Sequence, residues 1–340
     1  MALITALLII ALATVAATSF VMQQQLDIRR TGNLINGDQA WAYATAGEGW
    51  AKLILRRDQH DDAKDNIFTD DLTEPWAQPL APDKLPGGHT AVRITDAQAR
   101  LNLNNLVMPD ANAADDEQGE PTTPPQRAAN APQGLMGAQA SQVDQTTLVR
   151  LLRLLTRLQL DQGLADAIVD WIDRDINPRG SYGAEDDYYS GSKHPYRTAN
   201  QPMGSISELR LVRGFTEKAY QKILPFVVAL PTHTDINVNT APAEILAALP
   251  IMDAKSAVAL TKLRQENPFK TIQDFQNAFS TVAGVPQGPG TAVTGIDVTT
   301  QYFNVTVDTR IGYGRASINS LLYRDEQGDI KMIQRAHGGL

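Results

Sequence analysis

The sequence contains no cysteine. The chain therefore has no disulfide framework, no thiolate nucleophile and no Cys-ligated zinc, so any bound metal must be held by oxygen or histidine. An excess of positive charge is lacking as well, because the formal net charge is -8 at pH 7. An acidic chain has no general attraction to nucleic acid or anionic lipid, although a local basic patch remains possible. We therefore expect no nucleic-acid partner.

Common signatures of catalytic sites are missing too. The sequence has neither an H-E-x-x-H zinc motif nor a G-x-S-x-G nucleophile elbow. A pair of carboxylates in acid/base chemistry would need a cleft with substrate-binding aromatic side chains, and no segment marks one. We therefore predict that the chain is not an enzyme. The histidines show no metal-ligand spacing; they are His60, His89, His194, His233 and His337.

The chain begins with an uncharged apolar run over residues 1–25. Its length matches the roughly 20 residues of a bilayer-spanning helix, so we predict a membrane helix. A signal peptide is the alternative, because residues 15–17 resemble a small-residue cleavage site. The run lacks the basic start of a signal peptide, as if a leader had been removed. Arg29 and Arg30 favour a cytoplasmic soluble part by the positive-inside rule, and a lost basic leader reverses that orientation.

The helical pattern continues beyond the apolar run and becomes amphipathic. One long helix can therefore leave the membrane and pack its second half on a soluble domain. Gly32, Asn36 and Gly37 are weak positions where this helix can kink or loosen. The apolar stripe consists of Ala40, Trp41, Ala44, Gly47, Ala51, Ile54 and Leu55.

Strand-like alternation occurs at both ends of the remaining chain. Residues 90–106 alternate as in a half-buried hairpin, with Leu101 and Leu103 in its second strand. Residues 296–324 show the same period, and a turn at "DEQGD" leads into a last strand over residues 330–334. Because helical text lies between these regions, we predict an α+β fold in which one β-sheet is interrupted by an inserted helical domain.

These patterns divide the 340 residues into several parts. Residues 109–142 lack periodic apolar positions and are rich in Pro, Ala, Gln and acid, which predicts a mobile linker. The predicted parts are the membrane helix at 1–25, the long helix with the first strands at 26–108, the linker at 109–142, the helical insertion with an acidic loop at 143–290, and the strands completing the sheet at 291–340.

Helix signals are clear inside the insertion. Residues 144–160 place leucines on one face of a helix. Ser205 with Glu208, and Thr271 with Asp274, each form a capping box that starts a further helix.

Two places in the chain share one phrase. "ARLNLNNL" at residues 99–106 and "TDINVNTA" at residues 234–241 each lead into a pair of helices. The second copy resembles a helix-hairpin-helix unit, a module often used to grip nucleic acid. Its hairpin "PIMDAK" has no glycine and places Asp253 where an anion would sit, which favours a purely structural role. Asn237 and Asn239 are then expected to bond the turn to backbone groups.

An acidic loop, "DWIDRDINPRGSYGAEDDYY", occupies residues 170–189. Asp173, Asp175 and Asn177 have the i, i+2, i+4 spacing of the first ligands in an EF-hand. The EF-hand pattern then fails, because proline stands at position six and Glu185 falls one place late. A hard divalent cation still needs several converging oxygens, and only opposite charge makes so many close carboxylates tolerable.

The proline and glycines of this loop let the chain turn, so that Glu185, Asp186 and Asp187 can return to the Asp173 side. Calcium is the natural occupant of such an oxygen cage. A solvated acidic loop is the alternative, which the preceding apolar helix and the "YY" end disfavour. His194 either joins the loop or lies on the surface.

Four phrases are informative together: "MALITALLIIALATVAA", the acidic loop, "YRTANQPMGSISELRLVRGFTEKAYQKILPFVVALP" and "INVNTAPAEILAALP". They resemble one family, the type II secretion system minor pseudopilin K, called GspK or XcpX. The resemblance implies a pilin-like fold, in which a long N-terminal helix packs on an antiparallel sheet, with a large inserted helical domain that binds calcium. The positions that match the family's acidic motif are Asp173, Asp175, Asn177, Glu185, Asp186 and Asp187.

The resemblance also implies that a prepilin peptidase removed a short basic leader, leaving Met1 as the mature, N-methylated end. The lost leader places the helix in the bacterial inner membrane as a single pass, with the soluble part in the periplasm. Pilin-like proteins usually have glutamate at mature position five, where its carboxylate pairs with a neighbouring amine. Here Thr5 fits a filament tip with no neighbour above it. The alternative is an ordinary membrane residue bonded to its own helix.

The implied function is not enzymatic. The protein would cap the tip of the type II secretion pseudopilus, start its assembly and support export of folded proteins across the outer membrane. The implied partners are the minor pseudopilins I and J, with H below them, and secreted substrates or the secretin. An alternative from another class is a membrane-anchored helix-hairpin-helix protein that binds nucleic acid.

Overall fold

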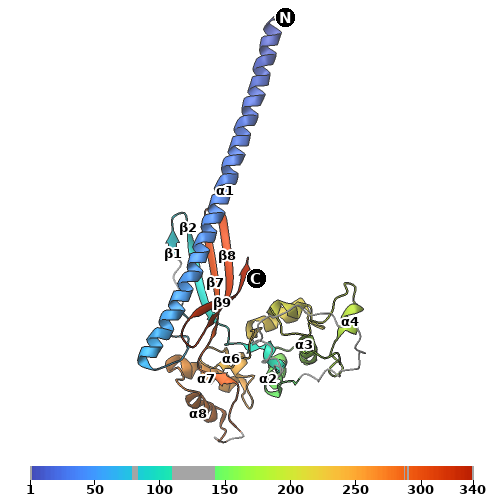
Figure 1. Ribbon diagram of the computed structural model, residues 1–340, viewed down its shortest axis with the longest axis vertical. Helices are drawn as coiled ribbons and strands as arrows, with labels where there is room; N and C mark the ends of the chain where they lie inside the picture. The colour runs from blue at the N-terminus through green and yellow to red at the C-terminus, as the bar shows by residue number, and fades with distance from the viewer. Residues whose placement is uncertain (1, 79–82, 109–141, 287, 289–290, 339–340) are drawn as a thin grey trace, which may run out of the picture. The chain divides into compact units, whose positions relative to one another are not determined.

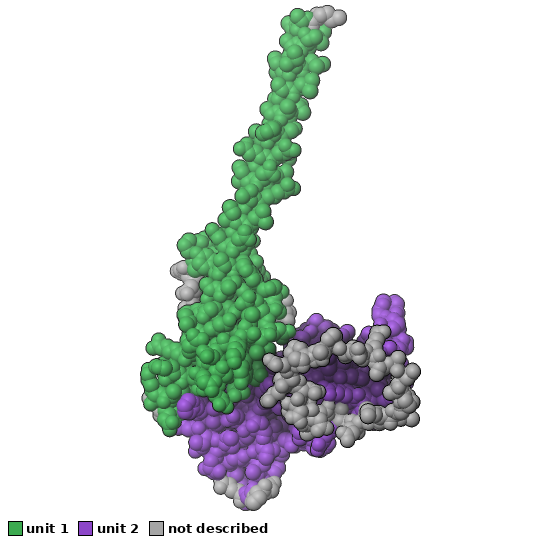
Figure 2. All heavy atoms as spheres, in the orientation of Figure 1, with its two compact units in different colours: residues 1–67, 73–96, 301–340 green, residues 68–72, 97–300 purple. Residues whose placement is uncertain are grey.

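The computed structural model describes residues 2–78, 83–108, 142–286, 288 and 291–338 (Figure 1). Met1 and the predicted linker, except for Gln142, lie outside the described residues. The chain forms two compact units, which Figure 2 colours separately. Unit 1 consists of residues 1–67, 73–96 and 301–340, and unit 2 consists of residues 68–72 and 97–300.

Unit 1 begins with one long helix, α1, which runs without interruption over Ala2–Asp65. A side chain at Gly32 or Gly37 would meet no atom within 4 Å, so both glycines lie on open helix surface. The structure therefore shows no break at these expected weak positions. The N-terminal part of α1 is apolar enough to cross a membrane, with a mean hydropathy of 2.3 in a window that is entirely unburied. It can act as a membrane anchor.

The second half of α1 packs on an antiparallel five-stranded sheet in the order β1-β2-β7-β8-β9 (Figure 1). The strand pairing joins β2 to β7 across the whole insertion, as the alternation at both ends of the chain predicts. The last strand, expected at residues 330–334, is confirmed and extends to His337. The strands are β1 (Asp83–Leu85), β2 (Gly88–Asp96), β7 (Tyr302–Ile311), β8 (Gly314–Arg324) and β9 (Ile330–His337).

Small residues bring α1 close to this sheet. Ala40, Ala44 and Ala51 are fully buried, and a Cβ at Gly47 would lie 2.8 Å from Cγ1 of Val307. Trp41, by contrast, is 39% exposed, so it lies outside the core although the sequence places it on the apolar stripe. The helix can approach the strands this closely because four of its inward positions carry no more than a methyl group.

Gly47→Ala should therefore destabilise unit 1 by about 1 kcal/mol, because overpacking outweighs the gain in helix propensity. Gly49→Ala is the matched control on the same helix, since a Cβ at Gly49 meets no atom within 4 Å. That control should stabilise the unit by up to about 1 kcal/mol. Urea unfolding of the chain lacking residues 1–25 measures both changes. Equal effects at the two glycines would contradict the close approach at Gly47.

A buried ionic cluster also fastens α1 to the sheet. Glu48 of α1 is 2% exposed and accepts two hydrogen bonds from Arg335 of β9, each of 2.8 Å. Ser320 of β8 donates to the same carboxylate at 2.8 Å, and Lys52 lies 2.9 Å away. Burial by itself would raise the pKa of Glu48, but the bonds from Arg335, Lys52 and Ser320 outweigh it and lower the pKa to about 2.

The regular secondary structure of unit 2 is mainly helical, and the unit has its own hydrophobic core. Its helices are η1 (Leu103–Leu106), α2 (Gln145–Arg157), α3 (Leu164–Ile172), α4 (Asp186–Ser190), η3 (Ile206–Arg210), α5 (Glu217–Ile223), η4 (Leu224–Phe226), α6 (Ala243–Leu246), α7 (Ala254–Glu266) and α8 (Ile272–Ala283). Its short strands are β3 (Leu101–Asn102), β4 (Val227–Val228), β5 (Ile236–Asn237) and β6 (Ile296–Asp297).

The strand pairing in unit 2 corrects the expected hairpin at residues 90–106. β3 pairs in parallel with β4, more than a hundred residues later, and not with β2. Leu101, Leu103 and Leu106 are buried in the helical core instead of extending the sheet. The predicted hairpin is therefore wrong. Unit 2 covers residues 68–72 and 97–300, whereas the sequence analysis places the helical insertion at 143–290, after a linker at 109–142.

The repeated phrase corresponds to a structural repeat. In the first half, Asn104 exchanges two hydrogen bonds with the backbone of Met203, of 3.0 and 2.8 Å. In the second half, Asn239 exchanges two bonds of 2.9 Å with the backbone of Phe269. β5 pairs in parallel with β6 as β3 does with β4. The asparagines of the repeat thus bond turns to backbone groups, as predicted.

Both predicted capping boxes are confirmed, and they occupy equivalent places in the repeat. Ser205 and Glu208 cap η3, two residues after Met203. Thr271 and Asp274 cap α8, two residues after Phe269. Each half of unit 2 therefore begins the helix after its asparagine-bonded residue with the same capping box.

Candidate metal centre

The acidic loop occupies a connection that is short in the other half of the repeat. In the second half, residues 267–268 join α7 to Phe269. In the first half, residues 173–202 make the equivalent connection from α3 to Met203. Both connections end at a residue whose backbone exchanges two hydrogen bonds with an asparagine side chain, Asn104 in the first half and Asn239 in the second. The loop is therefore additional to what the repeat needs for its fold.

Helix α3 fixes the start of this loop. Eight of its residues are buried, among them Ile168 and Ile172, because its sequence is apolar on nearly every side. Asp173 caps its C-terminal end, and the Asp173 N–H donates to the carbonyl of Val169 at 2.8 Å. A carboxylate at a helix C-terminus faces the negative end of the helix dipole. The ionised form of Asp173 thus needs a positive charge nearby.

Asp173, Asp175 and Glu185 form a compact oxygen group. One carboxylate oxygen from each lies within 4.8 Å of the other two. The three residues are only 4%, 7% and 5% exposed. Oδ1 of Asp173 and Oε1 of Glu185 are buried without a hydrogen-bond partner in the described structure. Buried polar atoms normally have partners, so these two oxygens indicate a ligand.

Electrostatics in this group disfavour ionised carboxyls. Burial, and then the charges of Asp175 and Asp170, raise the pKa of Asp173 from 3.8 to about 7. Burial, followed by the charges of Asp170, Asp173 and Asp175, raises the pKa of Glu185 from 4.5 to about 8. Bound positive charge would reverse both shifts, because it stabilises the ionised forms.

The remaining predicted ligands lie outside this group. Asn177 donates to Oδ1 of Asp175, from its backbone N–H at 2.8 Å and from its side chain at 3.2 Å. Asp186 accepts from the backbone N–H and hydroxyl of Thr198, at 3.0 and 2.9 Å. Asp187 is exposed on the first turn of α4. His194 is exposed as well.

Asn200 is a candidate ligand that the sequence did not single out. Its Oδ1 is buried and has no hydrogen-bond partner in the described structure. Its Nδ2 donates to the Asp175 carbonyl at 3.5 Å, which places the side chain beside the oxygen group. The backbone of Asn200 is held in turn by a 3.1 Å bond to the carbonyl of Trp171. An amide oxygen is a common calcium ligand.

Asp170 holds the backbone of the loop by hydrogen bonds. It is fully buried, and its two carboxylate oxygens accept from the backbone N–H of Arg179 at 3.2 and 3.1 Å. A Cβ at Gly183 would lie 2.3 Å from Oδ2 of Asp170, so this close approach requires glycine. Burial raises the pKa of Asp170, which the backbone hydrogen bonds partly offset. The sequence signal for this role is the position of Asp170 inside the otherwise apolar run "AIVDWI".

Aromatic side chains complete the surroundings of the loop. Tyr189 is 1% exposed and packs edge-on against Trp171, with ring centroids 5.5 Å apart. Its hydroxyl accepts from the backbone N–H of Arg213 at 3.1 Å. The second tyrosine of the "YY" end is therefore a core residue, as its apolar character indicated. The loop is thus anchored on the helical core through its buried residues, although most of residues 173–202 are exposed.

The oxygen group suits a hard divalent cation. It offers carboxylate oxygens and a nearby amide oxygen, without histidine or cysteine, which is the ligand set of calcium or magnesium. Two oxygens on opposite sides of a calcium ion, each about 2.4 Å from it, are about 4.8 Å apart. The residues present therefore fit a calcium ion.

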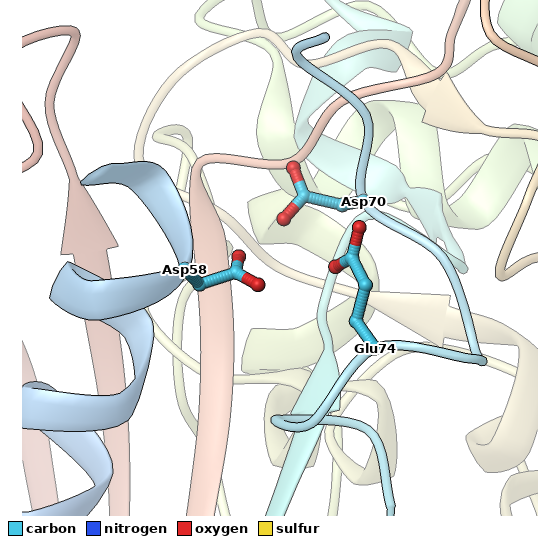
Figure 3. Close-up of side chains that lie close together, drawn as sticks. All are labelled: Asp58, Asp70 and Glu74. Atoms are coloured by element: carbon cyan, nitrogen blue, oxygen red, sulfur yellow. The ribbon is translucent and has the colours of Figure 1, made fainter. Parts of the chain in front are cut away.

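A second set of acids, Asp58, Asp70 and Glu74, is drawn in Figure 3. In unit 1, Asp58 of α1 pairs with Arg324 at 3.0 Å, and the indole of a nearby tryptophan donates to Glu74. In unit 2, Oδ2 of Asp70 accepts from the Thr300 N–H at 2.7 Å. Each of these carboxylates is bonded to protein groups, and we assign no metal to them.

Comparisons with known proteins agree with the division of unit 2 into two halves. Two family models match the chain, both described as type II secretion system (T2SS), protein K, over residues 99–232 and 236–298. The type II secretion system protein K of Pseudomonas aeruginosa is 34% identical over 347 residues, covering 100% of this chain and 93% of that protein. The chain belongs to the type II secretion system protein K family. The protein K of Aeromonas hydrophila is 33% identical and covers 100% of this chain.

A solved structure shares the fold of this protein K family member. It is the crystal structure of the GspK-GspI-GspJ complex from the enterotoxigenic Escherichia coli type 2 secretion system. The match has a TM-score of 0.69 and 25% sequence identity, and covers 92% of this chain and 100% of that chain. The pilin-like α+β fold is therefore confirmed. The two family models meet between residues 232 and 236, where the two halves of the structural repeat also meet.

Proposed function

We propose that the protein is a minor pseudopilin at the tip of the type II secretion pseudopilus. The observation that carries this proposal is the structural match over 92% of the chain to a complex named for GspK, GspI and GspJ. The chain would start filament assembly together with pseudopilins I and J, above H. It would support export of folded proteins across the outer membrane, in contact with secreted substrates or the secretin, and would carry out no catalysis.

The N-terminus supports a tip position. The hydroxyl of Thr5 donates to the carbonyl of Ala2 at 2.9 Å, within the same helix. Because position five has no carboxylate, no amine from a neighbouring subunit is needed in the bilayer to pair with it. The apolar part of α1 would anchor the chain in the inner membrane, with the soluble units in the periplasm. Processing by a prepilin peptidase and N-methylation belong to the same proposal.

We further propose that calcium occupies the acidic loop. Asp173, Asp175 and Glu185 would bind it, and Asn200 would add an amide oxygen. The unpartnered buried oxygens support this assignment. The ion would supply positive charge that lets the carboxyls ionise, and so hold residues 173–202 in one conformation. The other predicted ligands, Asn177, Asp186 and Asp187, would act by supporting the loop.

Nucleic-acid binding is not supported as an alternative. Asp253 begins α7 by accepting from the Ser256 N–H at 2.7 Å, so an acid stands at the position where phosphate would bind. Arg153 donates to the carbonyls of Ala247 and Met252 and thus bonds the hairpin within the unit. The helix-hairpin-helix-like units are therefore best understood as structural.

Co-purification tests the proposed function. The chain lacking residues 1–25, co-expressed with soluble fragments of pseudopilins I and J, should elute with both in one peak on size exclusion. The same fragment should not bind duplex DNA in 50 mM salt, the condition that favours electrostatic binding. Separate elution of all three proteins would contradict membership of the tip complex.

A further inference from the structure

Three tyrosines near the oxygen group form a surface that the metal centre does not use. Tyr182, Tyr188 and Tyr196 are 37%, 49% and 36% exposed. The guanidinium of Arg213 lies over the rings of Tyr182 and Tyr188, 5.4 and 4.6 Å from their centroids. The buried ring of Tyr189 contacts those of Tyr188 and Tyr196, at centroid distances of 5.3 and 5.1 Å. The three exposed tyrosines and Arg213 thus form one continuous surface, which we call the tyrosine row.

The surrounding chain holds the tyrosine row in place. A Cβ at Gly163 would lie 2.4 Å from Cγ of Tyr182, so the ring can lie there only because that residue is glycine. The hydroxyl of Tyr196 donates to the carbonyl of Leu211 at 2.7 Å. Arg213 donates to a carbonyl of the loop at 2.9 Å. Side chains fixed in this way lose little conformational entropy on binding, which suits a contact surface.

The structural repeat shows that the fold does not require this row. All three tyrosines belong to residues 173–202, the connection that only two residues make in the second half. The first half could therefore close without them. Contiguous exposed apolar surface usually marks an interaction site. We therefore looked for a role of the tyrosine row in binding.

The loop buries most of its acids and exposes its bases. Asp173, Asp175 and Glu185 are at most 7% exposed, and Asp186 pairs with Arg197 at 3.8 Å. The loop surface is therefore basic, although the whole chain has a net charge of -8. A basic surface attracts an acidic partner and repels a basic one. The exposed charged side chains of residues 173–202 are Arg174, Lys193 and Arg197, with Asp187 as the single acid.

From this arrangement we infer that the tyrosine row is a docking surface for an acidic patch on the folded proteins that the system exports. This inference rests on the proposed function and names the chemistry of the exported protein at this contact. Tyrosine and arginine are typical of residues that dominate binding energy at protein interfaces. The tyrosine rings would supply apolar contact area, while Lys193 and Arg197 would pair with carboxylates around it.

Charge reversal tests this inference in the bacterium that makes the chain. Exported proteins are first defined as those that disappear from the culture medium when the chain is deleted. Lys193→Glu with Arg197→Glu should lower their release by roughly tenfold or more, because like charges then face each other. Lys255→Glu with Lys262→Glu makes the same charge change on exposed positions of α7 and should leave release unchanged. Figure 1 shows α4 and α7 on opposite sides of unit 2.

The absence of cysteine allows a direct test of contact, because any introduced cysteine is unique. Full-length Tyr188→Cys is labelled with benzophenone maleimide and placed in nanodiscs with pseudopilins I and J. The exported proteins, purified from the medium, are then added and the sample is illuminated. We expect adducts with exported proteins that have an acidic surface patch. Val258→Cys on α7, where the native side chain is 43% exposed, is the control and should give none.

The outcomes separate docking from the proposed function. Equal adducts from positions 188 and 258, adducts with I or J alone, or unchanged release from the Lys193→Glu, Arg197→Glu variant would each overturn the docking role. All variants should still co-purify with I and J, because the changed side chains are exposed. If deleting the chain removed no protein from the medium, or if the unchanged chain did not assemble with I and J, the proposed function itself would be wrong.

Discussion

Calcium at 10 mM should raise the melting temperature of the chain lacking residues 1–25 by roughly 4 to 8 °C. A site of extracellular type with a Kd between about 0.1 and 1 mM stabilises the folded state by about 2 kcal/mol at this concentration. A domain of this size converts each kcal/mol into about 2 to 4 °C. The physical source is the neutralisation of Asp173, Asp175 and Glu185 at a buried position. Differential scanning fluorimetry with and without chelator measures the shift.

A pair of double variants separates the oxygen group from its surroundings. Asp175→Ala with Glu185→Ala should abolish the calcium-dependent shift, because two carboxylates of the group are lost. Asp186→Ala with Asp187→Ala removes the same formal charge from the adjacent turn. This second variant should retain most of the calcium-dependent shift in melting temperature. If the second pair abolished the shift and the first did not, the assignment of the ligands would be wrong. No shift in the unchanged protein would exclude calcium altogether.

The same site predicts a dependence on pH. The pKa values of Asp173 and Glu185 are raised to about 7 and about 8 in the folded protein. Stability from such groups is full below their ordinary pKa values near 4 and is lost as pH rises through the folded values. Without calcium, unit 2 should therefore become less stable between pH 5 and pH 8. Calcium binds the ionised forms, so its stabilising effect should grow over the same interval. A pH-independent effect would contradict a carboxylate site.

Local signals in the sequence were sufficient for part of this structure. Ser205 and Thr271 begin their helices through side-chain bonds to residues only three positions away, so a short pattern contains all the relevant information. The pairing of β3 with β4 is different. A strand as short as Leu101–Asn102 has the same alternation whether its partner is adjacent or more than a hundred residues later. Only the packing of the helical core decides between the two.

The candidate site shows the same division between local and distant information. Asp173 and Asp175 were predictable from their spacing after an apolar helix. The three consecutive acids at residues 185–187 looked equivalent, yet α4 begins there and turns Glu185 inward while Asp187 is exposed. Asn200 joins the site because the chain returns past Trp171, a contact that no spacing encodes. Which side chains of the loop converge is thus set by where its ends are held, here by α3 and by the bonds between Met203 and Asn104.

Glu48→Gln should lower the free energy of unfolding of unit 1 by about 3 kcal/mol at pH 7. The Glu48 carboxylate is buried among Arg335, Lys52 and Ser320, and its pKa falls from 4.5 to about 2. A shift of this size corresponds to about 3 kcal/mol of preference for the ionised form in the folded state. Glu326→Gln, at an exposed position of the β8–β9 turn, is the matched control and should change stability by less than about 0.5 kcal/mol.

The sign of the pH dependence distinguishes this charge from ordinary packing. Because the folded pKa of Glu48 is lowered, its contribution is present above pH 4.5 and is lost as pH falls toward 2. The difference between the unchanged chain and Glu48→Gln should therefore shrink steadily from pH 5 to pH 3 in urea titrations. A constant difference would mean that the glutamate acts by shape alone. In that case the bonds from Arg335 and Lys52 would not be what fastens α1 to the sheet.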